Sequence, residues 1–116
     1  PLTVYGDGGQ TRDYVYVGDV ARAHLRAAAL ATIPAGRVDE RAVNIGTGRE
    51  TSVLELAHAL MRASGRSATL SHADARPGEQ RRSVVSIDKA SRVLGWTPEV
   101  SLEDGLAKTF SWFSQR

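Results

Sequence analysis

The chain has 116 residues, of which 41% are apolar and 24% charged, the balance of a globular protein that forms one domain or part of one. Its formal net charge of +2 is too small to indicate a nucleic-acid or membrane partner, and no apolar run approaches the ~18 residues needed to cross a bilayer. The absence of cysteine excludes disulfides, thiolate catalysis and cysteine-ligated metals, and fits a cytoplasmic protein.

The N-terminal third predicts two extended segments followed by a helix. Residues 2–5 indicate a strand that ends in a glycine-rich turn, and residues 11–17 are rich in strand-forming side chains. Asp19 is expected to be the N-cap of an alanine-rich helix from about residue 20 to 32. Two helix breakers are expected to end this helix, Pro34 and Gly36.

The middle of the chain predicts a strand, a helix and a second strand. Residues 42–45 form an apolar run too short to alternate, which indicates a buried strand. Ser52 and Glu55 have the spacing of a capping box, and an apolar helical stripe follows until Gly65. Residues 68–72 are the candidate second strand.

The C-terminal third predicts a polar loop over residues 73–82 and then two helices. Asp88 is expected to cap a short helix that ends at Leu94, and Ser101 to cap the last helix. Four aromatic residues are expected to pack in the core: Trp96, Phe110, Trp112 and Phe113. The alternation of strands and helices indicates an α/β fold. The strands are too short for a self-sufficient sheet, so we expect the chain to complete a larger one.

Two arginines on separate segments are candidates for binding a diphosphate. Arg12 lies in an extended segment that leads into a helix, and Arg76 precedes Pro77, which favours an extended backbone. Each guanidinium can bind two phosphate oxygens, so the pair suits a clamp, and Glu79 is placed to accept hydrogen bonds from a ribose diol. The alternatives are a solvated loop around Arg76 and an ion pair of Arg12 with a nearby aspartate, Asp7 or Asp13.

Other possible motifs are weaker. Gly46 and Gly48 follow a strand and precede a helix, as in a dinucleotide-binding turn, but Thr51 stands where the third glycine is needed. A tight structural turn is therefore favoured. The three histidines do not have the spacing of a metal site, and no nucleophile turn is visible. No catalytic, cofactor-binding or metal-binding residue is predicted.

Several ordered motifs carry a resemblance that covers nearly the whole chain. They are Leu2–Gly8, Gln10–Val20, Asn44–Gly48 and Arg76–Glu79, followed by a typical tail from Leu94 to Leu106. In this order they resemble the NAD-dependent nucleotide-sugar epimerases and dehydratases of the extended short-chain dehydrogenase/reductase family, and most closely the UDP-glucose 4-epimerases. The resemblance implies that residues 1–116 are the C-terminal, substrate-binding portion of a Rossmann-type enzyme with an incomplete sheet.

The resemblance also implies roles for individual residues. Arg12 and Arg76 would bind the diphosphate of a UDP-sugar or another NDP-sugar, and Glu79 would bind the ribose. The backbone around Thr3 and Tyr5 would meet the edge of the uracil.

The rest of the enzyme would supply the chemistry. Residues 19–45 would pack with a cofactor domain upstream of Pro1, whose glycine-rich turn binds NAD. The catalytic Tyr-x-x-x-Lys pair is absent from this chain, so we expect it to be inactive alone. A homodimer, if formed, would use the upstream part.

Alternatives remain open from the sequence. A 4,6-dehydratase or a reductase of the same family would differ near the absent tyrosine, and a free-standing, non-catalytic binding module is a second class. Nucleic-acid binding is disfavoured because the chain has only two lysines and its arginines alternate with acidic residues.

Overall fold

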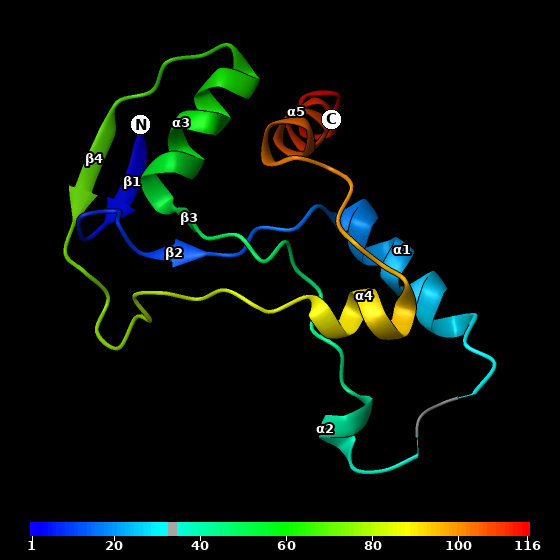
Figure 1. The fold of residues 1–116 in the computed structure, drawn as a ribbon. Helices are drawn as coiled ribbons and strands as arrows, with labels where there is room; N and C mark the ends of the chain where they lie inside the picture. The colour runs from blue at the N-terminus through cyan, green and yellow to red at the C-terminus, as the bar shows by residue number, and fades with distance from the viewer. Residues whose placement is uncertain (33–34) are drawn as a thin grey trace.

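The computed structural model describes residues 1–32 and 35–116, which form short strands and helices (Figure 1). The elements follow in the order β1 (Leu2–Tyr5), β2 (Thr11–Arg12), α1 (Val17–Ala28), α2 (Val38–Arg41), β3 (Thr51–Ser52), α3 (Val53–Ser64), β4 (Leu70–Ala73), α4 (Asp88–Leu94) and α5 (Leu102–Ser114).

The strands form two separate pairs. β1 lies parallel to β4, with Leu2 opposite Leu70 and Tyr5 opposite Ala73. β2 lies antiparallel to β3. Parallel neighbours need a crossover connection, and the connection here contains α3, which packs against both β1 and α5. The incomplete sheet expected from the sequence is confirmed for the described residues.

Two helix starts follow their predicted capping residues. The Ser52 hydroxyl accepts a hydrogen bond from the Glu55 N–H at 3.1 Å, and the Glu55 carboxylate accepts one from the Ser52 N–H at 2.7 Å. Gly65 ends α3 in the left-handed conformation, with φ of 64°. At α5 the Ser101 hydroxyl accepts from the Asp104 N–H at 3.1 Å. These local signals are confirmed.

The predicted bounds and cap of the first helix are wrong. Tyr16 is its N-cap residue, so Asp19 lies inside the first turn of α1. There its carboxylate is buried and binds backbone N–H groups of a distant segment instead of those of its own helix. α1 ends at Ala28; Pro34 lies outside the described residues, and Gly36 lies well beyond the helix.

The bounds of α4 agree with the sequence, but its cap does not. Ile87 precedes the helix and Asp88 is the first helical residue. Gly95 ends the helix with φ of 59°, as expected.

Residues 42–45 do not form the predicted strand. They pair with no strand among the described residues. Val43 and Ile45 pack against the core, and the carbonyl of Ala42 accepts a hydrogen bond from the Lys89 ammonium at 2.8 Å. The apolar signal therefore reflects burial against helices, because this segment has no neighbouring strand here.

The core is small and is centred on Trp96, whose exposed fraction is 0%. Ala23 from α1 and Ala90 and Leu94 from α4 surround it. The indole N–H donates to the carbonyl of Asp19 at 2.9 Å, so this buried polar atom is satisfied.

The aromatic residues at the end of α5 do not pack in the core as expected. Trp112 and Phe113 are 50% and 67% exposed. Their rings meet edge to face at 4.7 Å, and the Arg116 guanidinium lies 3.8 Å from the Trp112 ring centroid. Phe110 is partly buried.

The molecule is open for its size. Its radius of gyration is 17.0 Å, whereas a compact domain of this length has about 13 Å. Its accessible surface is 8095 Å², whereas a folded monomer of this mass exposes about 6,200 Å². Within the described ranges, no helix combines the length and apolar character that crossing a membrane requires.

Candidate functional site

A pocket of about 340 Å³ lies where β1 ends. Because β1 and β4 are parallel, the turn that follows β1 and the loop that follows β4 leave from the same edge. Open α/β sheets commonly bind ligands at the carboxyl ends of parallel strands. The residues that line the pocket come from both segments: Tyr5, Gly6, Asp7, Gln10, Ala75, Arg76, Glu79 and Arg81.

Arg76 is held at one wall of this pocket by an aromatic ring. Its guanidinium carbon lies 4.1 Å from the centroid of Tyr5, within cation–π range. The carbonyl of Arg76 accepts a hydrogen bond from the Glu79 N–H at 3.2 Å, which closes a tight turn. Gly78 has φ of 74° in this turn, a conformation that favours glycine. The turn places Arg76 and Glu79 on the same pocket.

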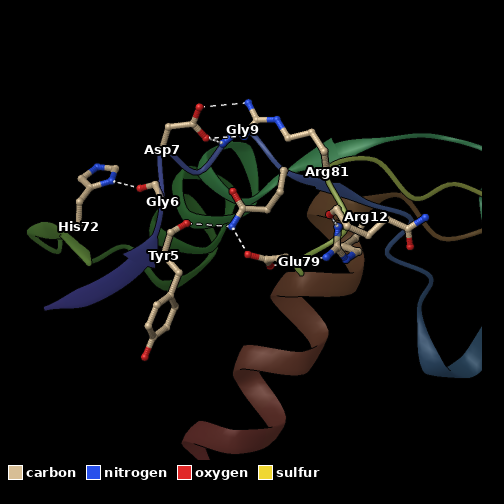
Figure 2. Close-up of polar contacts among 10 residues, drawn as sticks. Tyr5, Gly6, Asp7, Gly9, Arg12, His72, Glu79 and Arg81 are labelled. Carbon is tan, nitrogen blue, oxygen red and sulfur yellow. Dashed lines mark hydrogen bonds and ion pairs between the residues drawn. The ribbon is translucent and has the colours of Figure 1, made fainter. Parts of the chain in front are cut away.

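Arg12 lies beside the pocket and reaches it through Glu79 (Figure 2). Its Nη2 lies 3.5 Å from the Glu79 carboxylate. Its Nη1 donates to the carbonyls of Thr11 and Gln80, both at 2.7 Å. The alternative that Arg12 pairs with Asp7 or Asp13 is thus wrong for this structure.

The two residues predicted near a base lie in different places. Tyr5 lines the pocket, and its carbonyl accepts a hydrogen bond from the Gln10 side chain at 3.0 Å. Thr3 lies earlier on β1, opposite Ser71, and is not among the lining residues. The structure therefore brings together Tyr5, Arg76 and Glu79, places Arg12 next to them, and leaves Thr3 outside the pocket.

Comparison with known proteins identifies the family. The family model for GDP-mannose 4,6 dehydratase matches residues 1–109. The chain belongs to this family. The family resemblance and the α/β fold class expected from the sequence are confirmed.

Individual relatives are epimerases. A UDP-glucose 4-epimerase of Mycolicibacterium smegmatis is 42% identical over 113 residues, which cover 97% of this chain and 34% of the relative. The crystal structure of UDP-glucose 4-epimerase from Thermotoga maritima with UDP-glucose is 39% identical, with a TM-score of 0.85 over 98% of this chain and 35% of that one. The crystal structure of UDP-glucuronic acid 4-epimerase from Bacillus cereus, in complex with UDP-glucuronic acid and NAD, is 37% identical. Its TM-score is 0.87 over 99% of this chain and 35% of that one. The chain spans about a third of the length of these relatives.

The Gly46–Gly48 turn of this dehydratase-family chain is closed by an internal carboxylate. Asp13 accepts hydrogen bonds from the Thr47 N–H at 2.8 Å, the Thr47 hydroxyl at 2.6 Å and the Gly48 N–H at 2.9 Å. Those N–H groups are the donors that a dinucleotide turn would direct at a pyrophosphate. Because Asp13 already occupies them, these residues do not fit a cofactor site, in agreement with the structural turn favoured by the sequence.

The sequence assigned no role to two of the pocket residues, Gln10 and Arg81. Arg81 binds the Asp7 carboxylate with Nη1 at 2.7 Å and Nη2 at 3.1 Å (Figure 2). Hydrogen bonds from Arg81, and then from the Gly9 N–H, lower the pKa of Asp7 to about 2. Asp7 and Arg81 are 74 positions apart, so no spacing rule connects them.

One of the three histidines, His72 on β4, has a structural contact. The Nδ1 atom of His72 lies 2.8 Å from the carbonyl oxygen of Gly6 (Figure 2). Among residues 1–32 and 35–116, no three metal-binding side chains gather around a common point.

Proposed function

We propose that this chain supplies the nucleotide-diphosphate-binding part of an NAD-dependent enzyme similar to UDP-glucose 4-epimerase. The observation that carries the proposal is the single pocket in which Tyr5, Arg76 and Glu79 meet, with Arg12 attached through Glu79. The relatives from Thermotoga and Bacillus, whose structures hold UDP-sugars, support it.

The site residues predicted from the sequence have separate roles in this proposal. Arg76 and Arg12 bind the diphosphate, and Glu79 accepts hydrogen bonds from the ribose hydroxyls. A guanidinium has five N–H donors, and the Nη1 contacts of Arg12 to two carbonyls leave other donors for phosphate oxygens. The backbone of Tyr5 meets the base, and Thr3 contributes only through its place on β1.

The chain also presents a surface suited to a cofactor domain. We propose that residues 19–45 form this surface and pack against the cofactor domain. A second, largely apolar pocket of about 370 Å³ opens beside α1 and the 42–45 segment. Its apolar lining includes Ala23, Ala27, Leu30, Val43 and Ile45.

The proposal places NAD and the catalytic residues outside residues 1–116. Bound NAD would take up and return a hydride at the sugar. The present residues would bind and orient the nucleotide, so the chain alone would be inactive. The cytoplasmic location and a homodimer stay predictions from the sequence.

A 4,6-dehydratase acting on an NDP-sugar is the second candidate, because the matching family model carries that description. The nucleotide pocket would serve either reaction. Incubating the full-length protein with UDP-glucose and identifying the product would separate the two: UDP-galactose indicates the epimerase, and a 4-keto-6-deoxy sugar indicates the dehydratase.

The binding proposal is tested by isothermal titration of UDP into the full-length protein. Arg12→Ala and Arg76→Ala are each expected to weaken binding by about tenfold or more, because each removes a charge-assisted contact to phosphate. Arg66→Ala, at an exposed arginine just after α3, is the matched control and should leave the affinity unchanged. Wild-type affinity in both test variants would overturn the diphosphate assignment.

A further inference from the structure

We propose that Gln10 is a positioning residue of the pocket, which holds the Glu79 carboxylate in the orientation that binds ligand hydroxyl groups. The inference rests on the proposed nucleotide function, and it concerns a residue to which neither the sequence pattern nor the comparisons give a role.

Gln10 is buried although its side chain is polar. Its exposed fraction is 6%, in a molecule with few buried polar residues in its described part. A buried amide is costly unless it is hydrogen-bonded, so its partners determine what it does.

The backbone of Gln10 is fixed by the start of α3. The Gln10 carbonyl accepts from the Val53 N–H at 3.1 Å, and the Gly8 carbonyl accepts from the Leu54 N–H at 3.1 Å. These two bonds join the turn after β1 to the first residues of a capped helix. The Gln10 side chain therefore extends from a rigid base into the pocket.

The amide nitrogen of Gln10 connects two acceptors. Its Nε2 lies 3.0 Å from the Tyr5 carbonyl oxygen and 3.4 Å from Oε2 of Glu79. A carbonyl and an ionised carboxylate can only accept, so the NH₂ group, with its two hydrogens, must face them. One hydrogen fixes Gln10 to β1, and the other is directed at Glu79.

Glu79 is thus held at both of its oxygens. Arg12 lies 3.5 Å from Oε1, while Gln10 lies on Oε2. Each carboxylate oxygen has two lone pairs, so one acceptor position on each remains for a ligand. A pair of adjacent acceptors with a fixed separation suits the two hydroxyls of a vicinal diol. Gln10 determines which way the Oε2 acceptor faces.

The test measures whether the effect of changing Gln10 depends on the ligand hydroxyls. Affinities of wild type and variants for ligands with and without the diol are measured by isothermal titration on the full-length protein. Gln10→Met keeps the unbranched shape and removes the donor, and Gln10→Leu removes the donor with a shorter apolar side chain. Neither adds a charge that would repel the diphosphate. We expect either variant to bind UDP about fivefold more weakly than wild type. Binding of 2′,3′-dideoxy-UDP, which lacks the diol, should change less than twofold.

The matched control is Gln80→Met, at an exposed glutamine in the loop after β4 that is not among the residues lining the pocket. It should leave both affinities unchanged. A general disturbance of the pocket would weaken UDP and dideoxy-UDP equally, and that result, or an unchanged ratio of the two affinities, overturns the inference. If Gln10→Met does not fold, the ratio of the two affinities is measured with Gln10→Leu. Failure of wild-type protein to bind UDP at all would overturn the proposed function itself.

Discussion

The Asp19 carboxylate fixes the connection between α4 and α5 against the first turn of α1. It accepts hydrogen bonds from the Glu99 N–H at 3.1 Å, the Val100 N–H at 3.0 Å and the Arg22 guanidinium at 3.0 Å. Arg22 also donates to the carbonyl of Thr97 at 2.6 Å. Burial raises the pKa of Asp19, but the hydrogen bonds from Val100, Arg22 and Glu99 outweigh it and hold this pKa below its ordinary 3.8. The carboxylate is therefore needed in its ionised form.

Asp19→Asn is expected to lower the free energy of unfolding at pH 7 by about 2 kcal/mol, because an amide replaces one charged acceptor with a donor. The folded-state pKa is depressed, so the stabilisation is present above the unfolded pKa. It is lost as the pH falls through the lower, folded value. Urea unfolding at pH 7 and at pH 3 should show a smaller wild-type advantage at pH 3.

The control for this prediction is Asp74→Asn, at an exposed aspartate in the loop after β4. It should change stability by less than about 0.5 kcal/mol. An advantage of Asp19 that stays constant between the two pH values would contradict the role assigned to its charge.

Gly46 and Gly65 provide a matched pair of glycine substitutions. A Cβ on Gly46 would collide with the Val85 side chain and lie 2.7 Å from the Asp13 carboxylate, whereas a Cβ on Gly65 meets nothing within 4 Å. Gly65→Ala should therefore cost only the strain of its left-handed backbone, about 1 kcal/mol. Gly46→Ala should cost about 2 kcal/mol or more, because the Asp13-closed turn must shift. Equal losses in thermal unfolding of the two variants would count against the close packing of this turn.

At the scale of elements, sequence signals that act within a few residues predicted the structure well. The Ser52–Glu55 capping box and the glycine that ends α4 depend only on their neighbours, so the sequence shows them directly. Asp19 precedes a run of helix-forming residues, as an N-cap residue does, but the backbone N–H groups that it binds lie 80 and 81 positions away. The strand prediction for residues 42–45 was wrong for a related reason. The apolar residues indicate that the segment packs against the core, but they do not show which element covers it.

The candidate site also combines residues that local sequence signals predict with residues that long-range contacts bring together. The turn that brings Arg76 and Glu79 together is local, and Pro77 and Gly78 indicate it. The wall formed by Tyr5 and Gln10 depends on the pairing of β1 with β4, which no local pattern specifies. The family motifs supplied Tyr5 by resemblance and begin one run at Gln10, but the contacts that give Gln10 and Arg81 a place in the pocket are seen only in the structure.

The capping box of α3 should contribute measurably to stability. Ser52→Ala removes the acceptor for the Glu55 N–H and is expected to cost about 1 kcal/mol. Ser91→Ala, at an exposed position inside α4, is the control and should be neutral or slightly stabilising because alanine favours helix interiors. The check is chemical denaturation of both variants, and a similar effect in the two would argue against the capping contact.

At the scale of the whole molecule, the excess of exposed surface supports the proposal that the chain packs against further protein. The accessible surface exceeds that of a compact monomer of this mass, and the buried apolar side chains are few in the described part of the chain. The apolar pocket beside α1 is open, and the Trp112 and Phe113 rings at the end of α5 are half or more exposed in the described part of the molecule. The cofactor-domain contact proposed for residues 19–45 would cover the first of these.

Residues 1–116 expressed alone are therefore expected to be marginally stable. Their free energy of unfolding should lie below the range of about 5–15 kcal/mol that is usual for native proteins. Circular dichroism during heating should show a broad transition with low cooperativity, and an apolar dye should bind the native state. The full-length protein should unfold cooperatively without binding the dye. A sharp transition of the isolated chain above about 60 °C would show that the chain needs no partner surface.

The parallel contact between β1 and β4 joins residues 68 positions apart, and the pocket exists only when that contact is made. Closing a loop of this length costs about 4 kcal/mol of chain entropy, which a two-stranded pair of four residues each offsets only in part. A nucleotide that contacts both the turn after β1 and the loop after β4 would hold the two segments together. At a concentration of 100 times its Kd, it would raise the free energy of unfolding by about 2.7 kcal/mol. Ligand depletion would thus loosen the N-terminal strand first, and protease sensitivity near Leu2–Tyr5 would rise as the nucleotide concentration falls.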